Sequence, residues 1–372
     1  MLDNWNVVKL SDVIQIKYGK DHKKLAEGNI PVYGTGGIMR YVDRPLYCKK
    51  SVLIPRKGSL GNLYFVDKPF WTVDTLFYTE IDESQILPEY LYYKLKTYDL
   101  ASLNVGSAVP SLTTAVLYPL TIELPPVETQ MEIVSQLSAI DKKIKLNKKI
   151  NQNLEEMAQA IFKSWFIDLE PFGGEMPFEW KKVDFEEIST IQNGFAFKSK
   201  DYIDEGVRMI RTTNFDNGFV NNHNLINLPL NFYSDPMYQK FVFRRFDTVI
   251  VMVGASVGKI SLITDLNLPA LQNQNMWRFR PMNPNIPVTF IHYHVKEINN
   301  NVRGWSSGSA RDFYRKDIFK KAKINLPTEK VLKDFSKITL PLFAQINNNI
   351  LENDRLTQIR NMLLSQLLSS KL

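Results

Sequence analysis

A single periodic segment decides the fold of this chain. Residues 133–165 read IVSQLSAIDKKIKLNKKINQNLEEMAQAIFKSW. Apolar side chains and two asparagines recur there in alternating steps of four and three, at Ile133, Leu137, Ile140, Ile144, Asn147, Asn151, Leu154, Ala158, Ile161 and Trp165. These are the a and d positions of a heptad repeat sustained over more than four heptads. The segment therefore predicts a long helix whose seam faces a partner helix.

The same seam returns 202 residues later in the chain. It occupies Phe335, Thr339, Leu342, Ile346, Asn349, Asn353, Leu356, Arg360, Leu363 and Leu367. Arg360 interrupts the apolar pattern, and the neighbouring Ile359 could turn into the seam instead. Pro341 should start or kink this second helix, because proline has no backbone N–H to donate.

The repeat extends beyond the helices. The offset of 202 carries Gly106-Ser107-Ala108 onto Gly308-Ser309-Ala310. Near the start of each copy the offset falls to 175, where Trp5-Asn6-Val7-Val8 resembles Trp180-Lys181-Lys182-Val183. The second copy therefore contains insertions, and the chain consists of two copies of one unit.

Each copy is predicted to have two parts. Short β-rich runs separated by glycine and proline, with a short helical stretch, indicate a compact mixed α/β domain, and the long helix follows it. We expect the first α/β domain at residues 1–125, a central spacer helix at 126–170, the second α/β domain at 171–327 and a C-terminal spacer helix at 328–372.

The asparagines predict how the two helices pair. The midpoint of the first seam is residue 149, so in an antiparallel coiled coil with a pseudo-twofold axis Asn147 would face Asn353 and Asn151 would face Asn349. A buried polar residue in a seam costs stability but fixes the register, because a slipped register leaves its amide unpaired. The alternative is two separate amphipathic helices, each packed on its own domain.

The composition limits the class of protein. Of the residues, 44% are hydrophobic, which is enough for large buried cores. The longest apolar run, Val249–Val253, is too short to span a membrane. The sequence starting at Met1 shows no secretory signal, and the single cysteine, Cys48, cannot form an intramolecular disulfide. We expect a cytoplasmic protein without a membrane partner.

Charge and shape together point to nucleic acid. The chain has 46 Lys and Arg against 39 Asp and Glu, which gives a net charge of +7. A straight helix from Glu128 to Asp168 would be about 60 Å long. Two-fold proteins read DNA half-sites about 34 Å apart, one helical turn of B-DNA. Two similar domains held apart by such a helix would suit a split DNA site with an unread spacer.

The chain resembles, along its whole length, the specificity subunit of type I restriction–modification systems. The resemblance is carried by an ordered set of segments: Pro31–Ile38 (PVYGTGGI), Asn193–Ser199 (NGFAFKS), Ile210–Asn214 (IRTTN), the two Gly-Ser-Ala loops, and Ile122-x-Leu124-Pro125 with its copy Ile324-x-Leu326-Pro327. The second copy departs from the first after its Gly-Ser-Ala loop.

The resemblance implies two target recognition domains, each reading one half of a bipartite site in double-stranded DNA. It also implies that the helices dock two adenine-N6 methyltransferase subunits and, through them, restriction subunits. S-adenosylmethionine, ATP and Mg²⁺ would then be bound by those partners, and this chain would hold no cofactor.

The sequence itself shows no catalytic motif of a DNA methyltransferase. Such an enzyme would carry an Asn/Asp-Pro-Pro-Tyr/Phe tetrad, whereas Pro125-Pro126 lacks both the amide and the aromatic residue. Gly254–Lys259 resembles a phosphate-binding loop but is one residue too short. His292 and His294 lie on a predicted helix with opposite orientations, so we expect one exposed and one buried histidine and no metal site.

Two alternatives remain open. A stand-alone metal-dependent nuclease could use Asp168, Glu179 and Lys181, which fit a loose Asp…Glu-x-Lys spacing. A helical scaffold without a DNA role is the third reading. DNA cleavage with magnesium, and the salt dependence of DNA affinity, would separate these possibilities.

The expected DNA contacts lie in basic and amide-rich loops. Arg and Lys suit guanine in the major groove, and Asn and Gln suit adenine. The candidates are Arg40, Arg44, Lys49, Lys50, Arg56 and Lys57 in the first domain, and Arg208, Arg211, Asn214, Arg244, Arg245, Gln272, Asn273, Gln274 and Asn275 in the second.

Overall fold

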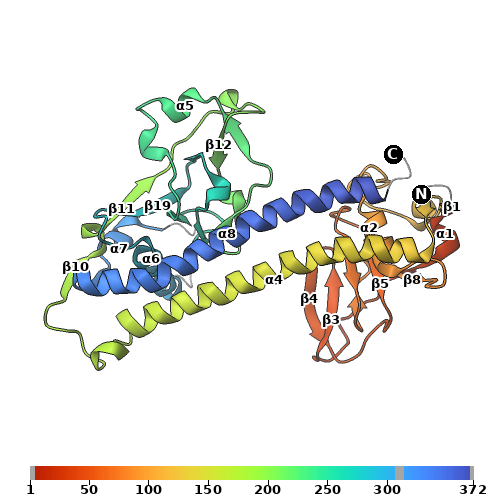
Figure 1. The fold of residues 1–372 in the computed structure, drawn as a ribbon, viewed down its shortest axis with the longest axis horizontal. Coiled ribbons are helices and arrows are strands. Elements are labelled where there is room, and N and C mark those ends of the chain that lie inside the picture. The colour runs from red at the N-terminus through yellow and green to blue at the C-terminus, as the bar shows by residue number, and fades with distance from the viewer. Residues whose placement is uncertain (1–4, 306–313, 369–372) are drawn as a thin grey trace. The chain divides into compact units, whose positions relative to one another are not determined.

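The two expected helices are present as α4 (Val127–Phe166) and α8 (Glu329–Leu367) (Figure 1). The structure is a computed structural model that describes residues 5–305 and 314–368, with the backbone alone for 303–305. Gly308-Ser309-Ala310 lies outside the described residues. The chain divides into two compact units, the first comprising residues 1–144 and 355–372, the second residues 145–354. Each unit thus contains one part of α4 and one part of α8.

The first unit is built on small sheets. A four-stranded sheet has the order β2-β8-β5-β6, a three-stranded sheet the order β4-β3-β7, and β1 pairs with β9. The elements before α4 are β1 (Asn6–Lys9), α1 (Leu10–Val13), β2 (Ile14–Tyr18), β3 (Ile30–Gly34), β4 (Gly37–Val42), β5 (Ser51–Pro55), β6 (Tyr64–Val66), β7 (Trp71–Thr72), β8 (Leu76–Ile81), α2 (Pro88–Leu95), α3 (Thr114–Leu117) and β9 (Thr121–Leu124). Strand β5 is buried at all five residues, because both of its faces are covered.

The second unit repeats this plan with additions. A six-stranded sheet has the order β11-β19-β16-β17-β14-β13, a three-stranded sheet the order β15-β12-β18, and β10 pairs with β20. The elements between α4 and α8 are β10 (Lys181–Asp184), β11 (Ser189–Asn193), β12 (Val207–Ile210), β13 (Phe215–Asp216), β14 (Phe219–Val220), β15 (Ile226–Leu228), α5 (Asn231–Ser234), β16 (Thr248–Val251), β17 (Ile260–Leu262), β18 (Ala270–Gln272), β19 (Met276–Pro281), α6 (Val288–Trp305), α7 (Lys316–Lys320) and β20 (Lys323–Leu326).

Strand pairing establishes the internal repeat. In the first unit β1 pairs antiparallel with β9, placing Asn6 opposite Leu124, and in the second unit β10 pairs with β20, placing Lys181 opposite Leu326. The parallel pair β3–β7 likewise has its counterpart in β12–β18. Strands β13 and β14 and helix α5 of the second unit lie between these shared strands, which accounts for the growing sequence offset.

Contacts within each unit show that α4 and α8 run antiparallel. In the second unit Asn147 Nδ2 donates to Asn353 Oδ1 at 3.0 Å, and Asn349 Nδ2 donates to Asn151 Oδ1 at 2.7 Å. Residue numbers thus rise along α4 as they fall along α8. The predicted fold class is confirmed: two tandem mixed α/β domains with two long helices that pair antiparallel. The reading as two unpaired amphipathic helices is therefore wrong.

The helices also contribute to the core of each domain. In the first unit Ile133, Leu137, Leu364 and Leu368 join the core beneath the sheets. In the second unit the corresponding layer is formed by aromatic and aliphatic residues of both helices: Ala158, Phe162, Phe166, Phe335, Phe343 and Ile346. Seam residues near the helix ends, such as Ile133 and Phe335, and residues beside the seam, such as Leu364 and Phe162, therefore pack into a domain core.

The structure excludes a start of the second helix at Pro341 and corrects the expectation for Ile359. Helix α8 begins at Glu329 and continues through Pro341, whose ring lies on the exposed side, where a lost backbone donor is least costly. Ile359 does not turn into the seam and remains 47% exposed. Arg360 stays there instead, because its Nη1 reaches Asp141 Oδ1 on α4 at 2.8 Å.

Candidate nucleic-acid interface

Three loops of the first unit meet beyond the carboxyl ends of β3 and β5. Thr35 Oγ1 donates to the carbonyl oxygen of Lys57 at 3.2 Å, and the N–H of Gly58 donates to the carbonyl of Pro110 at 2.9 Å. The Asn62 amide donates to the carbonyl of Thr35 at 3.0 Å. We call residues 35–37, 56–62 and 104–111 the first loop cluster; it includes the loop that carries Gly106-Ser107-Ala108.

The first loop cluster presents cations on a fixed support. The Arg56 guanidinium lies over the ring of Tyr18 at 5.3 Å, and its Nη1 donates to the carbonyl of Asp74 at 3.0 Å. Tyr18 is itself 51% exposed, and Lys57, the residue after Arg56, is exposed as well. At Gly61 nothing lies within 4 Å of an added Cβ, so another molecule can approach the backbone closely there. The cluster can therefore hold phosphates or a base edge.

The structure separates the other predicted cations from this cluster. Lys49 and Lys50 precede β5, whereas Arg56 and Lys57 follow it, so the two pairs stand at opposite ends of one strand. Lys50 Nζ bonds to Glu89 Oε1 at 2.8 Å, and this bond holds the pKa of Lys50 above its usual range. The Arg40 guanidinium donates to the carbonyl of Leu25 at 3.1 Å. Arg44 is exposed.

The second unit has its own group of loops, in which residues 252–258 follow β16 as residues 56–62 follow β5 in the first unit. The N–H of Phe195 donates to the carbonyl of Gln272 at 3.1 Å, and that of Met252 donates to the carbonyl of Asn275 at 3.1 Å. We call residues 192–195, 252–258 and 272–275 the second loop cluster. Gln274 and Asn275 are exposed in it, and Asn275 has a φ of 69°, a left-handed conformation that asparagine tolerates.

Two glycines show that the two units share the turn beside their loop clusters. A Cβ on Gly19 would lie 2.0 Å from the carbonyl oxygen of Val73, and a Cβ on Gly194 would lie 1.8 Å from that of Asn273. Each glycine follows the end of the strand that pairs with β8 or β19, respectively. The turn after Val73, with Asp74 exposed, therefore corresponds to the turn after Asn273.

Several predicted amides are used inside the protein. Gln272 is fully buried, and its Nε2 donates to the carbonyls of Gln192 at 3.0 Å and Met276 at 3.1 Å. Asn214 is also buried, accepting from the N–H of Arg211 at 3.0 Å through its Oδ1. Asn273 is buried too. These three residues therefore use their amides on backbone groups within the protein and do not present them to solvent.

The arginines of the second unit also differ in their surroundings. Arg208 Nη1 donates to the carbonyl of Leu266 at 2.6 Å, and Arg211 Nη2 to that of Asn224 at 2.9 Å. Arg244 and Arg245 are exposed. The Arg245 guanidinium lies 4.5 Å from the ring centroid of Phe246. Within the described part of the chain, no hydrogen bond, ion pair or ring contact joins these four side chains to Gln274 or Asn275. The last two are neighbours in one turn of the second loop cluster.

The sequence did not single out the supports of the first loop cluster. Tyr18, Asn62 and Asp74 lie in three separate segments, and each touches a loop that carries a predicted residue. The only available signal was the pairing of Gly19 with Gly194 at the offset of 175. Spacing alone cannot show that these segments meet.

The buried asparagines form a polar layer in the helix pair of the second unit. Besides Asn353, Asn147 Nδ2 also bonds to Glu352 Oε2 at 2.7 Å. Asn151 and Asn349 are both buried. The two asparagine pairs are those that the midpoint of the heptad pattern predicts.

The residues of the nuclease alternative do not form a metal site. The Asp168 carboxylate pairs with Lys163, and Glu179 and Lys181 are exposed. Within residues 5–305 and 314–368, no group of three or more His, Cys, Asp or Glu could hold a metal ion. His292 and His294 are both buried, so the expectation of one exposed histidine is wrong.

Comparison with known proteins gives the family. A family model described as the type I restriction modification DNA specificity domain matches residues 2–156 and 177–360. The chain belongs to this family. Two matches in one chain agree with the internal repeat, and the resemblance read from the sequence is confirmed.

Similar proteins span the whole chain. The MjaIX specificity subunit of Methanocaldococcus jannaschii is 23% identical, with 99% of this chain and 94% of the relative covered. The HindI specificity subunit of Haemophilus influenzae is 22% identical, with 89% of each covered. The crystal structure of the S subunit from M. genitalium matches with a TM-score of 0.62 at 18% identity, covering 98% of this chain and 96% of that one. The fold is therefore that of an S subunit.

No helix in the described part of the chain is long and apolar enough to cross a membrane.

Proposed function

We propose that this chain is the DNA-reading subunit of a cytoplasmic type I restriction–modification complex, in which each α/β domain reads one half of a bipartite site in double-stranded DNA. The domains would be target recognition domains, within residues 1–125 and 171–327. The observation that carries the proposal is the duplicated strand pair, β2–β8 in the first unit and β11–β19 in the second, with loops of different chemistry beside it in each unit. Two copies of one unit would suit a site with two halves, one for each domain.

The two loop clusters differ in their hydrogen-bonding chemistry. The first offers Arg56 and Lys57, which donate and suit guanine. The second offers the exposed amides of Gln274 and Asn275, which can both donate and accept and suit adenine. We therefore infer that the two half-sites differ in sequence, with the guanine contact on the first domain.

The long helices are proposed to dock two adenine-N6 methyltransferase subunits and, through them, restriction subunits. Outward-facing apolar side chains on α4 and α8 support this, because isolated coiled coils are polar on their outer faces. The exposed ones are Met131, Leu146 and Met157 on α4, and Ile338, Leu340, Ile359 and Met362 on α8.

Methyl transfer and DNA cleavage are assigned to those partners. S-adenosylmethionine, ATP and Mg²⁺ would be bound there, and the present chain would position the complex on its site. The chain's own contribution is then affinity and sequence choice, which differ in salt dependence: phosphate contacts weaken steeply with salt, whereas base contacts decide between sequences.

A domain exchange tests the proposal. Residues 1–125 are replaced by those of a relative, the chimera is assembled with its methyltransferase subunits, and methylated adenines are mapped on genomic DNA. We expect one half of the site to change and the other half and the spacer to stay the same. A chimera that changes both halves, or neither, would contradict separate reading by the two domains.

The nuclease reading has a direct test on the isolated chain. Purified protein is incubated with plasmid DNA and magnesium, beside a Glu179→Ala variant. We expect no cleavage by either. Cleavage that disappears in Glu179→Ala would overturn the assignment of catalysis to the partners.

A further inference from the structure

The second unit has a pocket at a position where the equivalent residues of the first unit pack against one another. Strand register gives the correspondence: Val7 lies opposite Glu123 in the pair β1–β9, and Lys182 lies opposite Asn325 in the pair β10–β20. Val7 therefore corresponds to Lys182, and Glu123 to Asn325.

The helices above these strands align as well. At an offset of 200, buried residues of α2 and its preceding turn match buried residues of α6 and its preceding turn: Ile86 with Ile286, Leu91 with Ile291, and Leu95 with Val295. Lys94 therefore corresponds to His294. The offset of 202 between the long helices makes Leu368 correspond to Phe166.

In the first unit this place is closed by an ion pair. The Lys94 ammonium is buried and lies 3.1 Å from Glu123 Oε2. It also donates a hydrogen bond to the carbonyl oxygen of Leu368 at the end of the helical segment. The Lys94 ammonium thus bonds to both acceptors, the Glu123 carboxylate and the Leu368 carbonyl.

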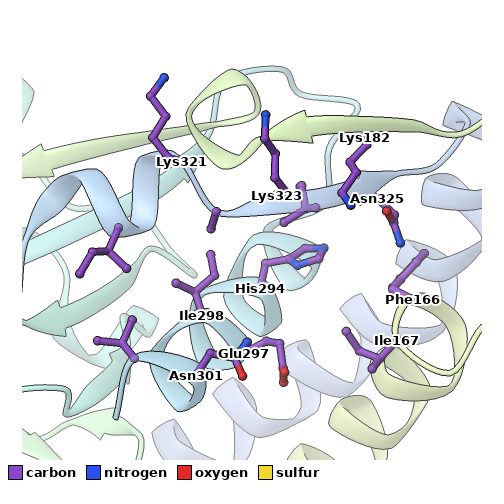
Figure 2. A pocket seen from close by; sticks show the side chains of 14 residues that line it. Phe166, Ile167, Lys182, His294, Glu297, Ile298, Asn301, Lys321, Lys323 and Asn325 are labelled. Carbon is purple, nitrogen blue, oxygen red and sulfur yellow. The ribbon is translucent and has the colours of Figure 1, made fainter. Parts of the chain in front are cut away.

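In the second unit the corresponding residues line a cavity of about 640 Å³. His294, Asn325 and Phe166 form part of its wall, together with apolar residues such as Ile298 and several charged side chains (Figure 2). His294 Nε2 is buried without a hydrogen-bond partner, and burial lowers the pKa of this imidazole to about 3, so the ring is neutral. A cavity of this volume is in the range that encloses small organic ligands.

The residue differences between the two units also change the charge at this position. The ion pair Lys94–Glu123 becomes the neutral pair His294 and Asn325, and the uncharged Val7 becomes Lys182. Figure 2 shows the ammonium end of Lys182 turned toward Asn325. Among the described residues, Lys182 has no ion pair or hydrogen bond from its side chain.

The remaining charges of the wall do not cancel this cation. Lys321 pairs with Glu186 at 2.6 Å, and Lys323 pairs with Asp184 at 2.7 Å. Glu297 also lines the pocket but is drawn on the opposite side from Lys182 in Figure 2. An anionic group is therefore favoured at the Lys182 end alone.

We propose that this pocket binds a small organic anion with a planar apolar body. The carboxylate or phosphate of the ligand would bond to Lys182 and to the amide of Asn325, and its ring would lie against Phe166 and Ile298. Because the place is filled in the first unit, the chain would bind one such ligand. The site is separate from both loop clusters.

Three probes of one shape test the charge preference on the full-length chain: naphthoate, naphthalenemethanol and naphthalenemethylamine. Binding is followed by saturation-transfer NMR and by the ring-proton shifts of His294. We expect saturable binding of naphthoate, with the neutral and cationic probes at least about tenfold weaker, because a charge-assisted hydrogen bond is lost. Equal affinity of the three probes, or no saturable binding of naphthoate, would overturn the proposal.

Variants that copy the first unit provide the control. The double change His294→Lys with Asn325→Glu installs the ion pair that fills the place in the first unit, and should abolish naphthoate binding. Lys182→Val, at an exposed strand position, should weaken it about tenfold or more whether or not the double variant folds. Unchanged affinity in Lys182→Val would refute the assignment of the anion to this lysine.

Discussion

Asn349 donates a hydrogen bond from Nδ2 to Oδ1 of Asn151 at 2.7 Å, and both side chains are buried between the long helices. The pair therefore ties the register of α4 and α8 to two amides that can satisfy one another only in the observed alignment.

Replacing one member of this pair should cost more than replacing both. Asn151→Leu removes the acceptor of the buried Asn349 Nδ2 group, while Asn349 Oδ1 still accepts from Gln345 Nε2 at 2.8 Å. The unsatisfied donor should lower the free energy of unfolding by about 1–3 kcal/mol. The double change to leucine removes both polar groups and should recover most of that loss. Urea unfolding of the single and double variants measures this, and additive losses would show that the two amides act independently.

Arg56 should contribute to DNA affinity far more than Lys50. Arg56 is held in the first loop cluster by Tyr18 and Asp74, whereas Lys50 stands at the other end of β5 and pairs with Glu89. Arg56→Ala should weaken binding to the cognate site by about 1–3 kcal/mol, roughly tenfold or more. Lys50→Ala is the matched control and should change affinity less than about twofold, because it leaves the loop cluster intact.

Fluorescence anisotropy with labelled cognate and scrambled duplexes distinguishes the kinds of contact. If Arg56 reads a base, the loss is confined to the cognate duplex; a phosphate contact would weaken both duplexes alike. An equal effect of Arg56→Ala and Lys50→Ala on the cognate duplex would contradict the placement of the interface in the first loop cluster.

Gly194 should not tolerate even a methyl group. The added Cβ would lie 1.8 Å from the carbonyl oxygen of Asn273, and the backbone there is fixed by the paired strands β11 and β19. Gly194→Ala should therefore destabilise the protein by about 1–3 kcal/mol. Gly61→Ala, where nothing lies within 4 Å of the new atom, is the control and should stay within about 0.5 kcal/mol of the parent.

The midpoints of urea unfolding of Gly194→Ala and Gly61→Ala measure the two changes in stability. DNA binding gives a second readout, since Gly194 supports the second loop cluster and Gly61 lies in the first. Parent-like stability of Gly194→Ala would mean that the turn after Asn273 can move away.

His294 should make the protein less stable in acid. Burial lowers its pKa from 6.5 to about 3, so the histidine takes up a proton on unfolding at any pH between these values. Its contribution is complete above pH 6.5 and is lost progressively as the pH falls toward 3. The slope for one proton is about 1.4 kcal/mol per pH unit.

A variant isolates this contribution. The free energy of unfolding is measured between pH 7 and pH 4 for the parent, for His294→Leu and for His223→Leu, the last at an exposed position. His294→Leu should flatten the dependence by about one proton, whereas His223→Leu should leave it nearly unchanged. Equal slopes in parent and His294→Leu would show that the imidazole is protonated in the folded protein.

The sequence was sufficient for the helices because their information is local and repeated. A heptad pattern extending over residues 133–165 and returning at 335–367 determines both the helices and the side on which they meet. The asparagine pairs follow from the same pattern, since the centre of an antiparallel seam is a matter of counting. The alternation of short strands likewise sufficed for mixed α/β domains.

The loop clusters could not be derived in this way. Gln272 and Gln274 are two residues apart and of one type, yet one is buried on backbone carbonyls and the other is exposed. Arg56 depends on Tyr18, which is far away in sequence. Whether an amide side chain bonds to the backbone at a turn or points to solvent depends on how several segments pack together. Composition and spacing do not contain that information.

The position of Arg360 in the helix seam could not be explained from the sequence either. It breaks the apolar pattern of its own helix, and its partner Asp141 lies 219 residues away on the other helix, at 2.8 Å. Asp141 also accepts a hydrogen bond from the Tyr93 hydroxyl at 2.9 Å. The arginine therefore belongs to a partly buried network and is not a defect of the seam.

Restoring the heptad at this position should accordingly harm the protein. Arg360→Leu leaves the Asp141 carboxylate without its cation and should lower the free energy of unfolding by about 1–3 kcal/mol, although leucine suits the seam. Adding Asp141→Asn removes the uncompensated charge, and the amide can still accept from Tyr93, so part of the loss should be recovered. Urea unfolding of both variants is the measurement. A more stable Arg360→Leu protein would show that seam packing outweighs the network.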